Sequence, residues 1–175
     1  AIDIVDTAHS YGIKVIWGYS WGWVDNMKDN DPIDLNNPDC LQKFKTEIIT
    51  KFERQYLKTG GDGVYFQSFT ETNNDVKDGK IIAQAVTEWV NAIAYDLLKK
   101  YPDLKLQFGL HAISVKNRLE FIKNVDTRIE IIWEDCGAFP QSYDGDDVAD
   151  FDNTLNFTQK ISLLRGKDDK FGYVI

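Results

Sequence analysis

Two groups of acidic residues in this sequence follow runs with the composition of buried β-strands. Glu71 ends the run 63–71, in which Val, Tyr and Phe follow Gly63, and the adjacent Glu134 and Asp135 follow the apolar run 129–133. In parallel α/β proteins, the loops that leave the carboxyl ends of the strands form the face where reactive groups lie. Two carboxyl groups at such an edge are the minimum needed to hydrolyse a glycosidic bond. The sequence therefore predicts a glycoside hydrolase that acts on a carbohydrate substrate without a cofactor.

Glu71 is the candidate general acid. Near apolar and aromatic walls it would lose hydration, its pKa would rise, and its proton could pass to a leaving glycosidic oxygen. Gln67 and Thr70 before it and Asn73 after it supply polar groups for substrate binding. The alternative is that Glu71 pairs with a lysine in a solvated loop.

Glu134 or Asp135 is the candidate base, nucleophile or water-orienting residue. Adjacent residues on a strand point to opposite faces, so at most one of the two can face the site, and the other braces a strand or caps a loop. The inward carboxylate must stay ionised, and Gln67, Asn73 or His111 could donate hydrogen bonds to it. His111 ends the strand between the two acids and is interpreted either as a substrate contact or as a structural residue.

Aromatic residues surround the same strand ends. Trp17, Tyr19, Trp21 and Trp23 follow one another at a spacing of two, and Trp133 directly precedes the second acidic group. Flat aromatic rings suit the C–H faces of sugars, and an indole N–H can donate to a hydroxyl. Trp17 and Tyr19 could equally be core residues, whereas Trp21 and Trp23 are interpreted as exposed at the mouth of a site.

Helical and strand patterns alternate along the chain and would position these residues. The predicted helices are 1–11, 38–57, 79–100, 115–124 and 151–165, and the predicted strands are 13–19, 63–71, 104–110, 129–133 and 171–175. Trp89 lies on the apolar stripe of the third helix and is expected in the core. Such alternation predicts an α/β fold with a parallel sheet covered by helices.

We expect one domain over residues 1–175, an arc of about five strands cut from a (β/α)8 barrel. A small doubly wound sheet is the alternative, but the sequence lacks its phosphate-binding turn. A whole barrel needs about 250 residues, so the remainder of the barrel is an expected missing partner. The chain begins inside a helical pattern and not at Met, which also indicates truncation.

Composition excludes several classes of partner. The formal net charge of −8 argues against nucleic acid, and no apolar run is long enough to cross a bilayer. Two cysteines and two histidines, without a CxxC or HExxH pattern, give no metal site. The compartment stays open, with a secreted or periplasmic location preferred.

The motif order in the first 75 or so residues resembles the α-glucuronidases and the wider set of hexosaminidase-like barrel glycosidases. The resemblance depends on the run Tyr11-Gly12-Ile13-Lys14-Val15, the turn Asp34-Leu35-Asn36-Asn37-Pro38, and the stretch from Gly61 to Glu71. It implies that these strands are the third to seventh of a barrel. Glu71 then matches the acid on the fourth strand, and Glu134 or Asp135 a candidate base on the sixth. A second candidate base would follow the seventh strand, beyond Ile175.

This sequence departs from the α-glucuronidase pattern around the acid, and its uronate-binding residues cannot be located, so the resemblance leaves the sugar open. Two other functions also remain open. One is a carbohydrate-binding or structural barrel domain without catalysis, and the other is an unrelated parallel α/β enzyme acting on a small metabolite.

Overall fold

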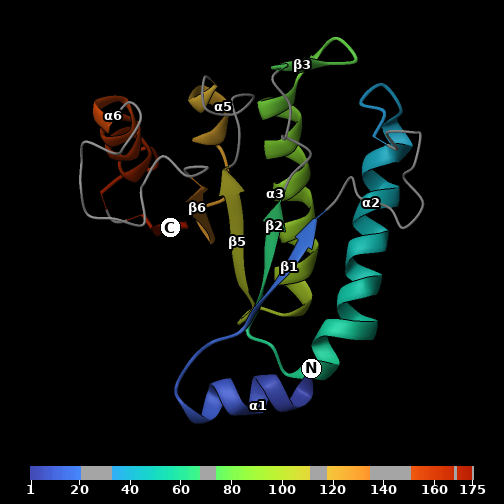
Figure 1. Cartoon of the computed structure of the whole chain (residues 1–175). Coiled ribbons are helices and arrows are strands. Elements are labelled where there is room, and N and C mark those ends of the chain that lie inside the picture. The colour runs from blue at the N-terminus through green and yellow to red at the C-terminus, as the bar shows by residue number, and fades with distance from the viewer. Residues whose placement is uncertain (21–32, 68–73, 111–117, 135–150, 168, 175) are drawn as a thin grey trace.

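The computed structural model describes residues 1–20, 33–67, 74–110, 118–134, 151–167 and 169–174. Helices and strands alternate along the chain (Figure 1). The helices are α1 Ile2–Ser10, α2 Pro38–Lys51, α3 Ile82–Lys100, α5 Leu119–Ile122 and α6 Phe151–Ser162. A short π-helix, η1 Phe52–Tyr56, and a short 3-10 helix, η2 Leu57–Thr59, follow α2. The strands are β1 Ile16–Ser20, β2 Gly63–Gln67, β3 Val76–Lys77, β4 Lys80–Ile81, β5 Lys105–Leu110, β6 Ile129–Glu134 and β7 Phe171–Val174.

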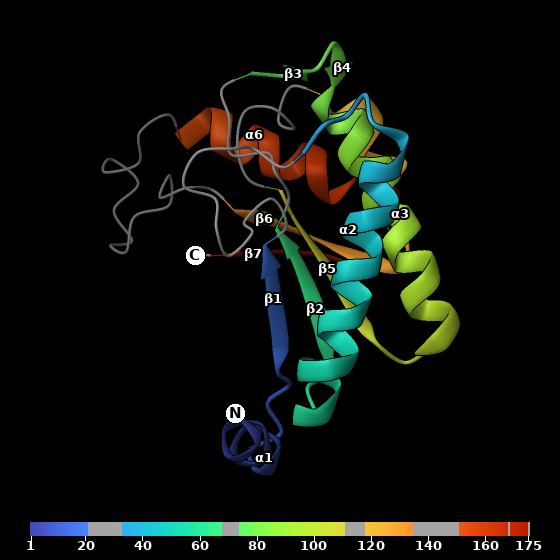
Figure 2. The ribbon, with the colours of Figure 1, turned by 90° about the vertical axis from the view of Figure 1, so that its right-hand side faces the viewer.

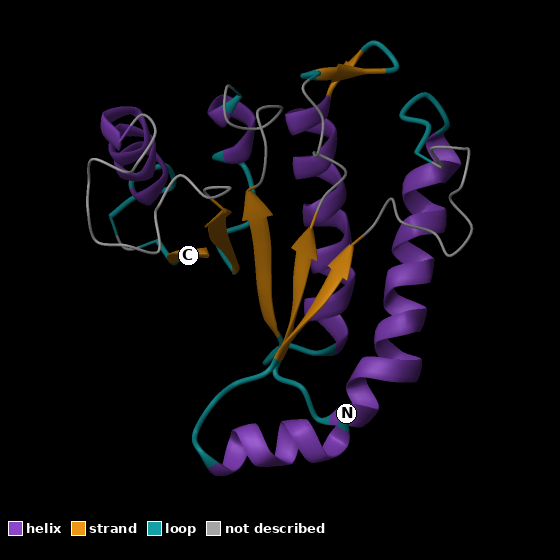
Figure 3. Cartoon of the chain, viewed as in Figure 1, coloured by secondary structure: helices purple, strands orange, loops and turns teal. Residues whose placement is uncertain are grey.

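The main sheet has five parallel strands in the order β1-β2-β5-β6-β7. Apart from the small β3–β4 hairpin, each strand lies beside the one that follows it in the chain, and β1 and β7 are the edges of the described sheet. Figure 3 shows the helices that connect these strands. The predicted α/β alternation and parallel pairing are therefore confirmed, whereas the described sheet is open and not closed into a barrel.

The hairpin β3–β4 was not predicted. The sequence placed residues 79–81 in a helix, but Val76 pairs with Ile81 across a tight turn, and α3 begins only at Ile82. Asp78 and Gly79 both have positive φ, 53° and 74°. A two-residue hairpin loop of Asp-Gly requires this backbone conformation. The Asp-Gly pair was thus a sequence signal for a hairpin that the helical stripe after it obscured.

The helices begin and end for local reasons. Asn37 caps α2 by accepting a hydrogen bond from the backbone N–H of Asp39, and Pro38 occupies the first turn. After η1 and η2, Gly60 ends the helical segment in the left-handed conformation. α3 buries a continuous apolar stripe, and Trp89 on that stripe is 6% exposed, so its predicted burial is confirmed.

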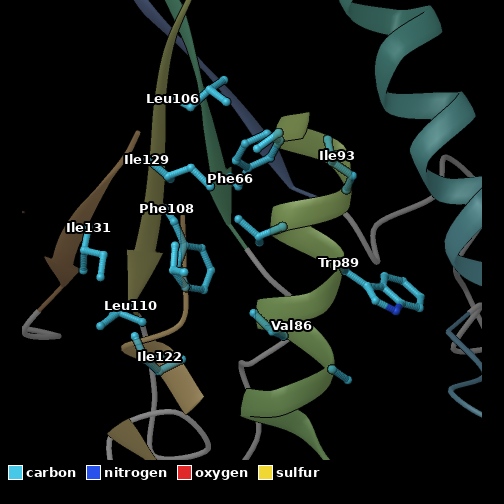
Figure 4. Packing of buried hydrophobic residues seen from close by; sticks show 14 of the residues in the cluster. Phe66, Val86, Trp89, Ile93, Leu106, Phe108, Leu110, Ile122, Ile129 and Ile131 are labelled. Atoms are coloured by element: carbon cyan, nitrogen blue, oxygen red, sulfur yellow. The ribbon is translucent and has the colours of Figure 1, made fainter. Parts of the chain in front are cut away.

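One hydrophobic cluster joins the sheet to α2, α3, α5 and α6. Figure 4 shows the part of it between the strands, α3 and α5. Every second residue of the central strands belongs to it, including Phe66 of β2 and Phe108 of β5, which are paired in register and 0% exposed. Burying a phenylalanine side chain stabilises the fold by about 1.5–3 kcal/mol. Since the members come from all four helices, these helices cover the same face of the sheet.

The alternate residues of the strands form the opposite face of the sheet. We call it the uncovered face, because none of the described helices shares the main hydrophobic cluster with these residues. Ile132 of β6 is buried yet lies outside the main cluster, as its alternate position requires. In Figure 1 the strands β1, β2 and β5 lie in front of α3, and Figure 2 shows α2 and α3 next to each other on one side of the sheet. A doubly wound sheet carries helices on both faces, so the described residues do not form one.

Candidate functional site

The carboxyl ends of neighbouring strands form one edge of the sheet, as the proposed site requires. β1, β2, β5 and β6 end at Ser20, Gln67, Leu110 and Glu134, and the register pairs Ser20 with Gln67 and Leu110 with Trp133. The segments 21–32, 68–73, 111–117 and 135–150 follow these strands in the chain. The predicted site residues that lie outside the described residues are Trp21, Trp23, Thr70, Glu71, Asn73, His111 and Asp135.

Three predicted site residues are placed by their backbone in the sheet. Tyr19 pairs in register with Phe66, Gln67 with Gly109, and Glu134 with Val174. β5 is the single strand between β2 and β6. Because neighbouring strands lie about 4.8 Å apart, the backbones of β2 and β6 are about 10 Å apart.

Trp17 lies on the helix-covered face. It pairs in register with Val64 of the core, and its ring stacks on Tyr56 of η1 with the centroids 5.8 Å apart and an interplanar angle of 19°. Its indole Nε1 is buried and has no hydrogen-bond partner among the described residues. The sequence left a core position and a sugar-binding position open for Trp17, and its contacts in the structure are those of a packing residue.

Trp133 also packs in the core. It is 4% exposed, and its ring lies 4.5 Å from that of Phe157 of α6, centroid to centroid. β6 alternates so that Ile131 and Trp133 face the helices, and both belong to the main cluster. Contact of Trp133 with a sugar stays a prediction, whereas its contact with α6 is observed.

Polar contacts that the sequence did not predict gather beyond the same edge of the sheet, around the hairpin β3–β4. Arg118, which precedes α5, donates from Nε to Asp75 Oδ2 at 3.0 Å, and its Nη2 contacts the same oxygen. Asp78 accepts a hydrogen bond from the backbone N–H of Leu35 at 3.0 Å. Partners 43 residues apart in sequence cannot be paired from spacing, although the Asp-Gly turn could have indicated the hairpin.

A polar row crosses the uncovered face. Gly18, Tyr65, Gln107 and Glu130 occupy one row of the register, and Gln107 Nε2 donates to Glu130 Oε2 at 2.6 Å. The Tyr65 hydroxyl is buried and has no hydrogen-bond partner among the described residues. The polar residues at alternate positions of otherwise apolar strands were the sequence signal for this row. They indicate a face that is not a simple hydrophobic core.

The amino end of the sheet carries a second group of charged residues. Asp62, just before β2, accepts hydrogen bonds from His9 Nε2 at 2.9 Å and from the backbone N–H of Val15 at 2.8 Å. The hydrogen bond from His9, and then that from Val15, hold the pKa of the Asp62 carboxyl below its usual range. This end joins α1 to the sheet and lies opposite the predicted site. In parallel barrels the amino end serves stability and not catalysis.

A shallow pocket of about 390 Å³ lies at this amino end, lined by residues that include Asp62, Lys100 and Tyr101. Two of its charged groups already have protein partners, because Lys100 pairs with Glu53 as Asp62 does with His9. No group of acidic, histidine or cysteine side chains in the described part of the chain could hold a metal ion. Within those same residues, no helix is both long and apolar enough to span a membrane.

No protein family model matches the chain, and no curated protein sequence matches it. Among solved structures, it is similar to the C-terminal domain of a candidate chitinase from Desulfitobacterium hafniense, with 14% sequence identity and a TM-score of 0.46. The similarity covers 81% of this chain and 38% of that chain. A likeness at this level does not establish an activity, so the residues and the strand order remain the basis for the functional proposal.

Proposed function

We propose that this chain is a consecutive arc of a (β/α)8 barrel that hydrolyses glycosidic bonds. The strand order is the observation that supports this most directly, since β1-β2-β5-β6-β7 proceeds in one direction with helices on a single face. Right-handed crossovers that all advance in the same direction put every helix on the same side of the sheet. In a barrel that side is the outer ring, and the uncovered face becomes the interior.

The strands β2 and β6, which lead to the two candidate acids, are close enough for the two carboxyl groups to act together. Glu71 comes four residues after Gln67, the last residue of β2, and Glu134 is the last residue of β6. The strands are about 10 Å apart, and side chains that reach towards each other would narrow that gap. Inverting glycosidases hold their carboxyl groups roughly 6.5–9.5 Å apart, and retaining ones about 5–5.5 Å. This separation favours inversion, with a water molecule between the acids.

The alternation of β6 favours Glu134 over Asp135 as the second acid. Successive residues of a strand point to opposite faces of the sheet. Position 134 therefore alternates in step with Glu130 and Ile132, which belong to the uncovered face, whereas Ile131 and Trp133 face the helices. Continued regular alternation would give Glu134 the interior face of the proposed barrel. Glu71 would protonate the leaving oxygen, and Glu134 would deprotonate the attacking water.

The proposal is tested with Glu71→Gln in the full-length protein, assayed on natural glycosides and on aryl glycosides with activated leaving groups. Loss of a general acid should lower kcat about 10²–10⁴-fold on poor leaving groups and much less on activated ones, which need little protonation. Glu88→Gln is the matched control, because Glu88 is exposed on α3 and should leave both rates unchanged.

Equal losses on both classes of substrate would show that Glu71 is not the acid. Absence of hydrolysis by the wild-type protein, together with measurable binding of oligosaccharides, would identify a carbohydrate-binding domain in place of an enzyme. Product stereochemistry, followed by NMR of the released anomer, separates inversion from retention. A retained anomer would contradict the spacing argument.

A further inference from the structure

Three of the segments that follow neighbouring strands lead into stretches of chain that are joined through the hairpin β3–β4 and the residue Asp75 before it. Segment 21–32, after β1, leads into Ile33; segment 68–73, after β2, leads into Asn74; and segment 111–117, after β5, leads into Arg118. The hairpin β3–β4 lies beyond the carboxyl ends of the strands, at the start of α3 (Figure 1). Polar contacts join the hairpin to Leu35, and Asp75 just before the hairpin to Arg118, in the chain that follows the other two segments.

The first connection is to the segment before α2. Asp78, at the hairpin turn, accepts a hydrogen bond from the backbone N–H of Leu35, and Lys80 Nζ donates to the carbonyl oxygen of Leu35. Ile33 and Leu35 are buried in the main hydrophobic cluster, at 2% and 6% exposure. The hairpin is therefore held against a part of the chain that is itself fixed by the core.

The second connection is to the segment before α5. Arg118 reaches Asp75 Oδ2 through both Nε and Nη2, which fixes the guanidinium more firmly than a single contact would. The carbonyl oxygen of Asp75 also accepts the backbone N–H of Ile82, the first residue of α3, at 3.0 Å. Asp75 thus joins the exit of the β2 segment to two helices.

We propose that Leu35, Asp75, Asp78, Lys80 and Arg118, here called the hairpin clamp, position the segments that carry the candidate catalytic residues; this rests on the proposed function. Glu71 lies four residues from Gln67 on one side and four from Asp75 on the other. Four residues span at most about 14 Å, so both tethers limit where the carboxyl group can go. Proton transfer requires the acid within hydrogen-bond reach of the leaving oxygen, and small misplacements are costly.

Arg118→Gln in the full-length protein removes the charge and the fork, and Arg118→Lys keeps the charge alone. Hydrogen exchange of residues 74–82 should quicken about two- to fivefold in Arg118→Gln, as expected for loss of a half-exposed ion pair. If the clamp positions Glu71, kcat should fall by about tenfold or more with little change in KM, and Arg118→Lys should fall between this variant and wild type. Arg128→Gln is the matched control, because Arg128 forms a similar pair with Asp126 at the amino end of the sheet.

A second variant keeps the test informative if Arg118→Gln does not fold. Exchanging the partners, Asp75→Arg with Arg118→Asp, should restore much of the lost kcat and of the exchange protection. Faster exchange with unchanged kcat would mean that the clamp is only structural, and unchanged exchange would mean that no clamp exists; either result overturns the proposal. If the wild-type protein hydrolyses no glycoside, the proposed function fails by itself, and the exchange data still decide whether the clamp holds the three segments.

Discussion

Arg165 offers the clearest test of what holds this sheet together. Its guanidinium donates to four backbone carbonyl groups, those of Val125 at 3.1 Å, Asp126 at 2.9 Å, Ile129 at 2.7 Å and Lys170 at 3.5 Å, and to the Asp169 carboxylate at 2.7 Å. The side chains of Arg165 and Asp169 are only 1% and 4% exposed. The hydrogen bonds to Val125, Asp126 and Ile129 therefore join the start of β6 to the chain before β7, and the buried ion pair with Asp169 lies within that second stretch.

Replacing Arg165 by Met should be strongly destabilising. The substitution leaves the Asp169 carboxylate buried without its cation, and breaking a buried pair in this way costs about 3–5 kcal/mol. In the double variant Arg165→Met with Asp169→Leu, no charge stays buried, so part of this loss should be recovered. Recovery should be incomplete, because the carbonyl groups lose a donor and each buried unsatisfied group costs about 1–3 kcal/mol.

Urea unfolding followed by circular dichroism measures these losses, and thermal unfolding should show a fall in Tm of roughly 6–20 °C for the single variant. Arg128→Met is the control, since the Arg128–Asp126 pair is more exposed and should contribute less than about 1 kcal/mol. If Arg165→Met does not fold, Arg165→Lys, which keeps the charge and loses the fork, should show an intermediate loss. A loss for Arg165→Met no larger than that of the control would refute the argument.

Two further predictions concern the amino end of β2. Since hydrogen bonds from His9 and Val15 lower the pKa of Asp62 in the folded state, its stabilising contribution is complete above the ordinary carboxyl range and is lost as pH falls through the folded pKa. The stability difference between wild type and Asp62→Asn should therefore shrink below about pH 4, and a difference independent of pH would contradict this. Gly63→Ala should lower the free energy of unfolding by about 1–3 kcal/mol, because its new Cβ would lie 2.2 Å from the backbone carbonyl oxygen of Lys105. Gly18→Ala is the control in the same unfolding assay and should be tolerated, because nothing lies within 4 Å of its new Cβ.

Most of the fold could be predicted because its determinants are local. The apolar stripe of α3, the cap at Asn37 and the short apolar runs of β5 and β6 identify helices and strands without reference to the rest of the chain. Their alternation then restricts the strands to parallel pairing. The hairpin β3–β4 was missed because Ile81 and Ile82 continue the helical pattern, although the Asp-Gly turn before them stops it.

The candidate site was harder to predict, since the same residue type serves packing and binding. Trp17 and Trp133 fit a sugar platform as well as a core, and only their contacts with Tyr56 and Phe157 place them against helices. Glu71 lies outside the described residues, so its assignment as the acid stays a prediction. The alternation of residues along β6 favours Glu134 over Asp135 as the second acid, which the residue types alone could not decide.

The sequence by itself determined the order of helices and strands and the edge of the sheet at which the acidic segments begin, because periodicity and turn residues act over short distances. The tertiary structure alone decided which residues share a face and which distant residues meet. Arg118 with Asp75, and Arg165 with the chain before β6, are pairs separated by more than 30 residues. Any of the 20 Lys and Arg residues could in principle pair with any of the 28 Asp and Glu residues, and only the packed sheet brings particular partners within hydrogen-bond distance.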